Sequence, residues 1–490
     1  MLLLLFRGIS QNKSPEKVQS ETAQNYRVVF PMNEYLTTDG AAPYPVLIKE
    51  KFQNINTSSF VNVIDYGASG NGSKPDDTAI AKAFAACKDG GGILFPPGKT
   101  FLIHDLIRVP VNKNITIYAY GAVFKMARNT GYNAIALECD SSGKYKILWL
   151  GGIFDGNKDQ QSYPGSNSNK NEWVVSHANY GLLTIKRAQF ALVKDVTLKN
   201  TVYDGVDLFE CVLGVIADSK AYAGVNLNYS KQRSKYGKGH QATYFKCTRR
   251  NSQVVYFINL DCKEGSIGIQ YSTNVVSDSS LAVVNNCHFD NQSQDAIHFE
   301  SCRKIFVYKS TIDASDNSKN YHADLHISNS CEIASIKDCE FNNGRIDFHN
   351  GSDLQIGIVE NCRFETSQHQ NDTVSLRNFI HNATYVKNCV FKGKTKEEQV
   401  TAKYITESQF KNFDVAVRAI SLIYKCAFDN GRTAVANPDK PVIEACTFSD
   451  ISNTTSGKES SDNNTNWKNF LNTSIIVTDQ KEKFLGYIAR

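Results

Sequence analysis

Apolar residues recur along the chain in short alternating runs of the strand type, separated by Asn, Asp, Gly and Ser. Within these runs one local frame returns every 18 to 29 residues in most steps: a small residue followed two positions later by an apolar or aromatic one. The frame reads NNCHF, KDCEF, ENCRF, KNCVF, YKCAF and EACTF, with the small residue at Cys287, Cys339, Cys362, Cys389, Cys426 and Cys446. Serine takes the place at Ser310 and Ser408, and the series continues upstream through Cys262, Ser219 and Val196. The chain therefore contains an internal repeat.

A repeat of this length, built from short β-rich runs, predicts an all-β fold in which the chain winds as a parallel β-helix. Equivalent residues of successive coils then stack about 4.8 Å apart, and the Cys-x-Phe frame suits an inward-pointing pair. Leucine-rich repeats have a similar period but need a leucine frame that is missing here. Cysteine packs well as a small buried apolar residue, and the chain has no Cys-x-x-Cys pair for zinc. We therefore expect a stacked Cys/Ser/Val ladder, with no disulfides, no metal and no cofactor.

Composition narrows the possible partners. A hydrophobic content of 41% over 490 residues is ample for a core. A net charge of +5 is small for this length, so we expect no nucleic-acid partner, although an acidic polysaccharide is compatible with it. The leading MLLLLF is too short for the core of a signal peptide, and no run reaches the roughly 18 apolar residues of a membrane span. We therefore expect no membrane contact.

The segment from Phe60 to Ile103 predicts how the coil starts. After the loop YGASGNGSKPDDT, Asp76 or Asp77 is expected to cap a helix that covers the open first coil. The apolar face of that helix consists of Ile80, Ala83, Phe84 and Cys87. The later Gly-Lys-Thr in GGGILFPPGKT is not a phosphate loop, because its glycine spacing is wrong and a strand-like run follows it.

The same segment resembles the start of the pectate lyase/polygalacturonase-like superfamily, through VIDYGASGNG, DDT and GGGILFPPGKTFLI. LWLGGIFDGN resembles an early-coil phrase of pectinases, in which Asp155 is expected to be a turn residue. Members include secreted pectinases, alginate epimerases and many phage tailspikes. The resemblance implies a right-handed parallel β-helix over residues 60–450 with an N-terminal capping helix, an attachment or capping segment at 1–59, and a cap or subunit contact at 451–490. It also implies an extracellular or virion location and, for a tailspike, a homotrimer.

Outward strand positions are where chemistry is expected, because a groove can run across successive coils. The runs DGVDLFEC, GSIGIQYS, DAIHFESC, ADLHISNS and RIDFHNGS align as one frame. Strand alternation sends three sets of residues outward: Asp207, Gly268, His298, His326 and Asp347; Phe209, Gln270, Glu300, Ser328 and His349; and Asp324 with Arg345. Five of the ten histidines fall between residues 288 and 349, so this patch is the leading candidate for an active groove.

Two reactions fit the patch. Glycoside hydrolysis needs a carboxylic acid and a carboxylate about 5 Å or 6.5–9.5 Å apart, for which Glu300 with Asp347 or Asp324 is the candidate. A lyase needs a base and positive charge beside a uronate, for which His326 or His298 with Arg345 is the candidate. His298, His349 and Arg345 are also expected to contact substrate. We favour hydrolysis, with elimination as the alternative.

The resemblance offers a competing site upstream. VYDGVDL resembles the Asn-Thr-Asp-Gly phrase of polygalacturonases and places Asp204 at the catalytic aspartate, with Asp207 nearby. AGVNLN lacks the paired aspartates, KGHQATYFKC keeps only His240 of the Gly-His-Gly phrase, and no Arg-Ile-Lys occurs. Trp173, at the end of a polar loop, is a candidate for stacking on a sugar. The sequence thus predicts a depolymerase acting on an extracellular polysaccharide, with a non-catalytic glycan-binding spike as the rival.

Overall fold

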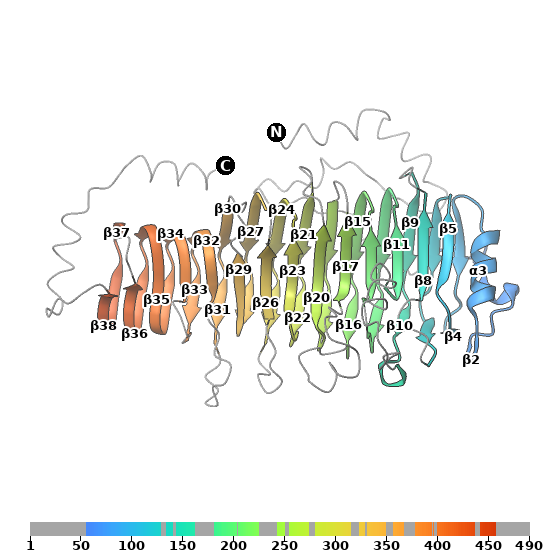
Figure 1. The fold of residues 1–490 in the computed structure, drawn as a ribbon, viewed down its shortest axis with the longest axis horizontal. Helices are drawn as coiled ribbons and strands as arrows, with labels where there is room; N and C mark the ends of the chain where they lie inside the picture. Colours follow the sequence, from blue (N-terminus) through green and yellow to red (C-terminus); the bar gives the residue numbers. More distant parts are fainter. Residues whose placement is uncertain are drawn as a thin grey trace, which may run out of the picture. The chain divides into compact units, whose positions relative to one another are not determined.

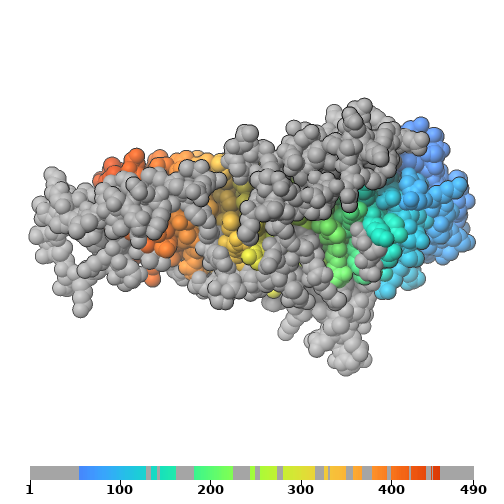
Figure 2. Space-filling view, turned by 90° about the horizontal axis from the view of Figure 1, so that it is seen from above, coloured from blue at the N-terminus to red at the C-terminus, as the bar shows by residue number. Residues whose placement is uncertain are grey.

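The computed structural model describes residues 55–456, apart from gaps at 129–133, 141–143, 162–180, 203, 225–242, 250–253, 274–279, 315–322, 329–330, 349–355, 367–377, 394, 396–398 and 437–441. The chain divides into two compact units. Unit 1 comprises residues 1–225, 230–262 and 273–283, and unit 2 comprises residues 226–229, 263–272 and 284–490. Figure 1 draws the described strands as ribbons, and Figure 2 shows the same residues in colour as filled spheres.

Unit 1 is built from three ladders of parallel strands (Figure 1). From β3 onward each strand pairs with the strand three places further along the chain, whereas β1 pairs with β3 and β2 with β4. Ladder A contains β5 (Ile107–Val111), β8 (Ile135–Cys139), β11 (Leu183–Lys186), β14 (Val206–Phe209) and β17 (Thr243–Arg249). Ladder B contains β1 (Val61–Asn62), β3 (Gly91–Leu94), β6 (Ile115–Tyr118), β9 (Lys146–Leu150), β12 (Phe190–Lys194), β15 (Leu213–Ala217) and β18 (Val254–Ile258). Ladder C contains β2 (Asn71–Pro75), β4 (Thr100–Ile103), β7 (Val123–Met126), β10 (Ile153–Asp155), β13 (Thr197–Lys199), β16 (Lys220–Tyr222) and β19 (Asp261–Lys263).

Unit 2 repeats the same three-ladder arrangement. Ladder A contains β20 (Ile267–Thr273), β23 (Asp295–Glu300), β26 (Ala323–Ser328), β29 (Gly344–Phe348) and β32 (Ile380–Lys387). Ladder B contains β24 (Lys304–Tyr308), β27 (Ile333–Lys337), β30 (Ile356–Glu360), the end of β32, β34 (Val400–Thr406), the end of β35 (Gln409–Tyr424) and β37 (Val442–Glu444). Ladder C contains β22 (His288–Asp290), β25 (Thr311–Asp313), β28 (Glu340–Asn342), β31 (Arg363–Glu365), β33 (Val390–Lys392), the start of β35, β36 (Ala427–Ala436) and β38 (Thr447–Ser456). The strand β21 (Leu281–Asn285) spans the boundary between the units.

The predicted fold class is confirmed, since the described chain is an all-β parallel β-helix. Parallel crossovers of this kind are right-handed in nearly all proteins. The two short 3₁₀ segments, η4 (Val63–Tyr66) and η5 (Lys158–Gln160), lie in the connections.

The predicted capping helix is α3 (Asp77–Ala86), which packs on η4, β1 and β5 at the start of unit 1 (Figure 1). Its inner face buries Ile80, Ala83 and Phe84 completely. The prediction that an aspartate side chain caps the helix is wrong. Asp76 stands at the N-cap, but its carboxylate accepts hydrogen bonds from the backbone N–H of Ser69 and from that of Leu102, which tie the glycine loop to β4.

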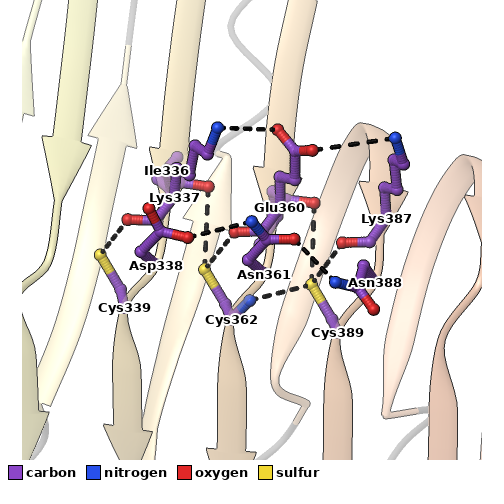
Figure 3. Close-up of polar contacts among 11 residues, drawn as sticks. Ile336, Lys337, Asp338, Cys339, Glu360, Asn361, Cys362, Lys387, Asn388 and Cys389 are labelled. Atoms are coloured by element: carbon purple, nitrogen blue, oxygen red, sulfur yellow. Dashed lines mark hydrogen bonds and ion pairs between the residues drawn. The ribbon is translucent and has the colours of Figure 1, made fainter. Parts of the chain in front are cut away.

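The cysteine frame is the corner between ladders B and C, as Figure 3 shows for three successive coils of unit 2. The residue before each cysteine has a positive φ: 56° at Asp338, 55° at Asn361 and 50° at Asn388. Asn and Asp tolerate this left-handed conformation better than other side chains, apart from Gly. The side-chain amide of Asn361 donates to Asp338 at 3.0 Å, and that of Asn388 donates to Asn361 at 2.9 Å. Each corner is therefore tied to the next.

The residue after each corner points into the core, as predicted. The thiols of Cys339, Cys362 and Cys389 each donate to the carbonyl oxygen two residues earlier at 3.2 Å. All thirteen cysteines are free, so the expected ladder without disulfides is confirmed. The aromatic residue of the frame stacks in register from coil to coil, with ring centroids 4.5 to 5.1 Å apart along Phe341, Phe364, Phe391, Phe410, Phe428 and Phe448.

Substituting one cysteine of the ladder tests this packing. Serine already occupies the position at Ser408, where its hydroxyl donates to Thr406 O and accepts from the N–H of Cys389. We expect Cys362→Ser to cost less than about 1 kcal/mol, and Cys362→Leu to cost about 1–3 kcal/mol because the column has no room for it. Urea unfolding measures both. A cost for serine equal to that for leucine contradicts the ladder.

Candidate functional site

One outward row of ladder A in unit 2 concentrates ionisable side chains. The Cα register aligns His298 of β23 with His326 of β26, His326 with Asp347 of β29, and Asp347 with His381 of β32. We call these four residues the acid–base row. The apolar residues on either side, such as Ile346 and Phe348, are fully buried, so strand alternation turns the row outward.

Asp347 is the centre of the row. Its carboxylate lies 3.1 Å from Nδ1 of His381, 3.2 Å from the guanidinium of Arg345 and 4.0 Å from Nδ1 of His326. Burial raises the pKa of this carboxyl, but the hydrogen bond with His381 and the charge of Arg345 more than offset it. The net effect lowers the pKa of Asp347, so it is a carboxylate at neutral pH. An ionised group of this kind orients the imidazoles that contact it.

The two histidines at the other end of the row, His298 and His326, stack on one another, and His298 also contacts a carboxylate. The rings of His298 and His326 stack with their centroids 5.0 Å apart. Nδ1 of His298 lies 2.8 Å from the carboxylate of Asp295, three residues earlier on the same strand. Within the row, the side chain of Asp347 is 12% exposed, and those of the histidines are 13% exposed at His298, 22% at His326 and 38% at His381. The row is therefore most open to solvent at His381.

The strand register places the predicted carboxyl partners of Asp347 at different distances from it: Asp324 is near and Glu300 is far. Asp324 aligns with Arg345, two residues before Asp347, so one strand step and two residues put the Cα atoms of Asp324 and Asp347 about 8 Å apart. Glu300 aligns with Ser328 and lies two strands and two residues from Asp347, about 12 Å between Cα atoms. It is farther still from Asp324, and it accepts a hydrogen bond from the hydroxyl of Ser272 at 2.8 Å. The register does not bring Glu300 to either partner.

The predicted alignment of β20 with β23 is wrong by two residues. Gln270 rather than Gly268 stands beside His298, and Ser272 stands beside Glu300. A shift of two keeps every side chain on its face, so alternation alone does not detect it. At Gly268 a Cβ atom would come within 2.6 Å of a backbone oxygen, so the site has no room for a side chain. The inward position beside Phe299 is occupied by Tyr271, which is fully buried.

Some predicted residues lie outside the described part of the chain, and others were missed. His349, Trp173 and His240 are not among the described residues, and only the backbone position of Asp324 is described. His381 and Lys246 were not predicted, although the runs FIHN and TYFKC carry the same alternation as the aligned frame. Asp155 accepts a hydrogen bond from the N–H of Asn157, which fits the turn role expected of it.

A second group, in unit 1, contains the other two predicted carboxyls. We call Asp204, Asp207 and Lys246 the Asp–Lys cluster. Asp204 precedes β14 and accepts hydrogen bonds from the ammonium of Lys246 at 2.8 Å and from the N–H of Thr243 at 3.1 Å. Asp207 aligns with Lys246 on the outer face, yet it is 0% exposed, and neither of its oxygens makes a hydrogen bond of good geometry.

The two carboxyls of the cluster differ in their surroundings. Burial raises the pKa of Asp207 to about 7, with a further increase from Asp204, although Lys246 lowers it. Burial lowers the pKa of Lys246, but Asp204 and Asp207 raise it more, so the lysine stays charged. A neutral acid beside an ion pair is a common arrangement for proton transfer. Both carboxyls are less than 5% exposed, however, unlike the acid–base row.

Across the described residues, no group of three or more His, Cys, Asp or Glu is arranged to hold a metal ion. No helix in the described part of the chain has the length and apolar character needed to cross a bilayer.

The strand ladders define a parallel β-helix protein, and the ionisable row lies on the outer face of unit 2. Its structure is similar to PfbA, a surface adhesin of Streptococcus pneumoniae, at 14% identity and a TM-score of 0.42, covering 83% of this chain and 96% of that one. It is similar to the Family 28 exopolygalacturonase of Yersinia enterocolitica at 13% identity and a TM-score of 0.42, covering 82% and 77%. It is also similar to tailspike protein 3 of bacteriophage CBA120 at 10% identity and a TM-score of 0.40, covering 92% and 70%. No family model matches the sequence. The predicted resemblance is confirmed as one of fold.

The buried carboxyl of Asp207 makes stability depend on pH. Its pKa in the folded chain, about 7, lies above the ordinary value of 3.8, so the folded state prefers the protonated form. The chain is therefore expected to lose stability as the pH rises from about 4 to about 7, by up to about 4 kcal/mol from this group. Asp207→Asn should remove the loss, which chemical unfolding at pH 5 and pH 8 measures. The exposed Asp105→Asn is the matched control, and an equal pH dependence in Asp207→Asn and the unaltered chain contradicts the assignment.

Proposed function

We propose that the chain cleaves an extracellular polysaccharide by hydrolysis at the acid–base row of unit 2. The observation that carries the proposal is the ionised Asp347, held between Arg345 and two histidines on the outward strand face, with Asp324 one strand away. A separation of about 8 Å between Cα atoms is compatible with the 6.5–9.5 Å between the carboxyls of inverting glycosidases.

The proposed roles follow from charge and position. Asp347 acts as the base that accepts a proton from the attacking water, while His381 and Arg345 hold its carboxylate in place. Asp324 donates a proton to the leaving glycosidic oxygen. His298 and His326, whose rings stack, contact the sugar chain beside the cleaved bond. Arg345 also favours an acidic sugar, because its guanidinium faces the same surface and can bind a carboxylate.

Elimination is the second candidate, and one observation favours it. Asp347 contacts an imidazole and a guanidinium at once, at 3.1 Å and 3.2 Å. An aspartate-oriented histidine is a suitable base for the proton beside a uronate carboxylate, and Arg345 is placed to stabilise the charge that forms. The products separate the two reactions, since elimination leaves an unsaturated sugar that absorbs in the ultraviolet and hydrolysis does not.

The similarity to tailspikes and surface adhesins agrees with an extracellular or virion location and a glycan partner, and we include both in the proposal. If the chain is a tailspike, we expect it to form a homotrimer. Light scattering of the full chain tests it, and a monomer at all concentrations argues for the secreted-enzyme version instead.

Carboxyl-to-amide substitutions test the site. Asp347→Asn and Asp324→Asn are each expected to lower the cleavage rate about 10²- to 10⁴-fold, the usual range for general acid or base groups, without changing thermal stability greatly. The assay offers a panel of acidic and neutral polysaccharides and follows new reducing ends together with ultraviolet absorbance. Glu365→Gln is the matched control, because Glu365 pairs only with Arg363 and Lys392 among its described partners in ladder C.

Three outcomes contradict the proposal in different ways. Full activity in both Asp variants, with loss in Asp204→Asn and Asp207→Asn, moves catalysis to the Asp–Lys cluster. Reducing ends together with ultraviolet absorbance replace hydrolysis by elimination. Tight binding of a glycan without any cleavage makes the chain a glycan-binding protein, the rival reading of the sequence.

A further inference from the structure

The outer face of ladder B in unit 1 is apolar. Trp149 points into the core, where its ring lies 5.6 Å from that of Phe124 and 5.5 Å from that of Phe154. Its strand neighbour Leu148 therefore points outward. The Cα register aligns with Leu148 a row that we call the outer stripe: Leu148 of β9, Leu192 of β12, Val215 of β15 and Tyr256 of β18.

The outer stripe is buried, although it faces away from the core. Exposure is 6% at Leu148 and no more than 2% at Leu192, Val215 and Tyr256. Burial also raises the pKa of the Tyr256 hydroxyl. The corresponding outward row of ladder B in unit 2 is only partly buried, at Phe306, Ser335, Ile358, Tyr385 and Tyr404. Outward position alone therefore does not bury these side chains.

Among the described elements of unit 1, the strands of the stripe pack mainly on their neighbours in the same ladder. The strands lie edge to edge in the three ladders, and α3 packs on η4, β1 and β5. Neighbouring outward side chains shield one another only at their flanks.

The start of the described chain lies at one end of the stripe. By register Phe60 stands beside Gly92 of β3, whose outward place continues through Thr116 of β6 to Leu148. The ring of Phe60 lies over Gly92, where a Cβ atom would come within 2.4 Å of it. The ring of Phe60 therefore lies on the outer row that leads to the stripe.

We propose that the outer stripe of unit 1 is the docking surface of the chain's own N-terminal segment, residues 28–54. That segment carries two short apolar runs, Val28-Val29-Phe30 and Val46-Leu47-Ile48, separated by polar residues and prolines. The far end of the stripe, at β18, lies six strand steps or about 29 Å from β1. Residues 46–59 alone span up to about 46 Å when extended, so the run nearest the coil reaches every strand of the stripe.

This pairing gives the N-terminal segment a structural role that is independent of the proposed catalysis. It buries an apolar surface that otherwise marks the protein for aggregation, and it fixes the segment along the side of the coil rather than leaving it as a tether. It also predicts that the 1–59 segment and the coil unfold together.

Thiol labelling at the stripe tests the proposal. Val215→Cys places a thiol on the outer face, and its reaction with a maleimide is read from the labelled peptide by mass spectrometry. We expect slow labelling in the full chain. Adding Val46→Asp, Leu47→Asp and Ile48→Asp should increase the rate about tenfold or more, because charged residues do not cover an apolar surface. A chain lacking residues 1–54 should label at least as fast.

Matched controls separate docking from unfolding. Gln11→Asp, Asn12→Asp and Ser14→Asp add the same charge outside the proposed contact and should leave the rate unchanged. Ser335→Cys, on the partly exposed row of unit 2, should label quickly in every version. Unmodified Cys362, which is buried in the core ladder, reports that the coil remains folded. Fast labelling of Val215→Cys in the full chain overturns the proposal, and so does slow labelling that persists in both the aspartate variant and the shortened chain.

Discussion

The structure depends on one constraint: equivalent residues of successive coils must stack on one another at the strand spacing. Parallel hydrogen bonding fixes that spacing at about 4.8 Å, so any residue that turns inward meets a copy of its own position above and below. The column of phenylalanines, with centroids 4.5 to 5.1 Å apart, and the column of free thiols both follow from it. Small groups that satisfy their own hydrogen bonds, and flat rings, are the side chains that stack well at this distance.

The same constraint fixes the corners and frees the outer surface. Asp338, Asn361 and Asn388 adopt the left-handed conformation and bond to one another, which ties successive corners together. Outward side chains do not pack in the core, so charged residues can occupy these positions at the regular strand spacing. In unit 2 this places three histidines and an aspartate on four adjacent strands. The ionisable row that carries the proposed function thus lies on the face that the core does not constrain.

Burial then decides what each outward carboxyl does. Asp347 and Asp207 occupy similar strand positions, but Asp347 has a histidine and an arginine in contact, and its pKa is lowered. Asp207 is fully enclosed without a good hydrogen bond, and burial raises its pKa to about 7. Strand alternation in the sequence predicts the same outward direction for both residues. Their difference lies in neighbours contributed by other coils and in what covers the face above them.

The sequence by itself determined the repeat, the inward Cys-x-Phe frame and the helix over the first coil, because each is a local pattern with a local physical cause. It also identified the outward face that carries His298, His326 and Asp347. Tertiary structure alone decided the register of Gln270 beside His298, the arrival of His381 and Lys246 at the two clusters, and the use of Asp76 to hold a loop rather than a helix end. Strand alternation has a period of two, so a shift of two residues changes the neighbours without changing the pattern. Only the pairing of whole coils removes that ambiguity.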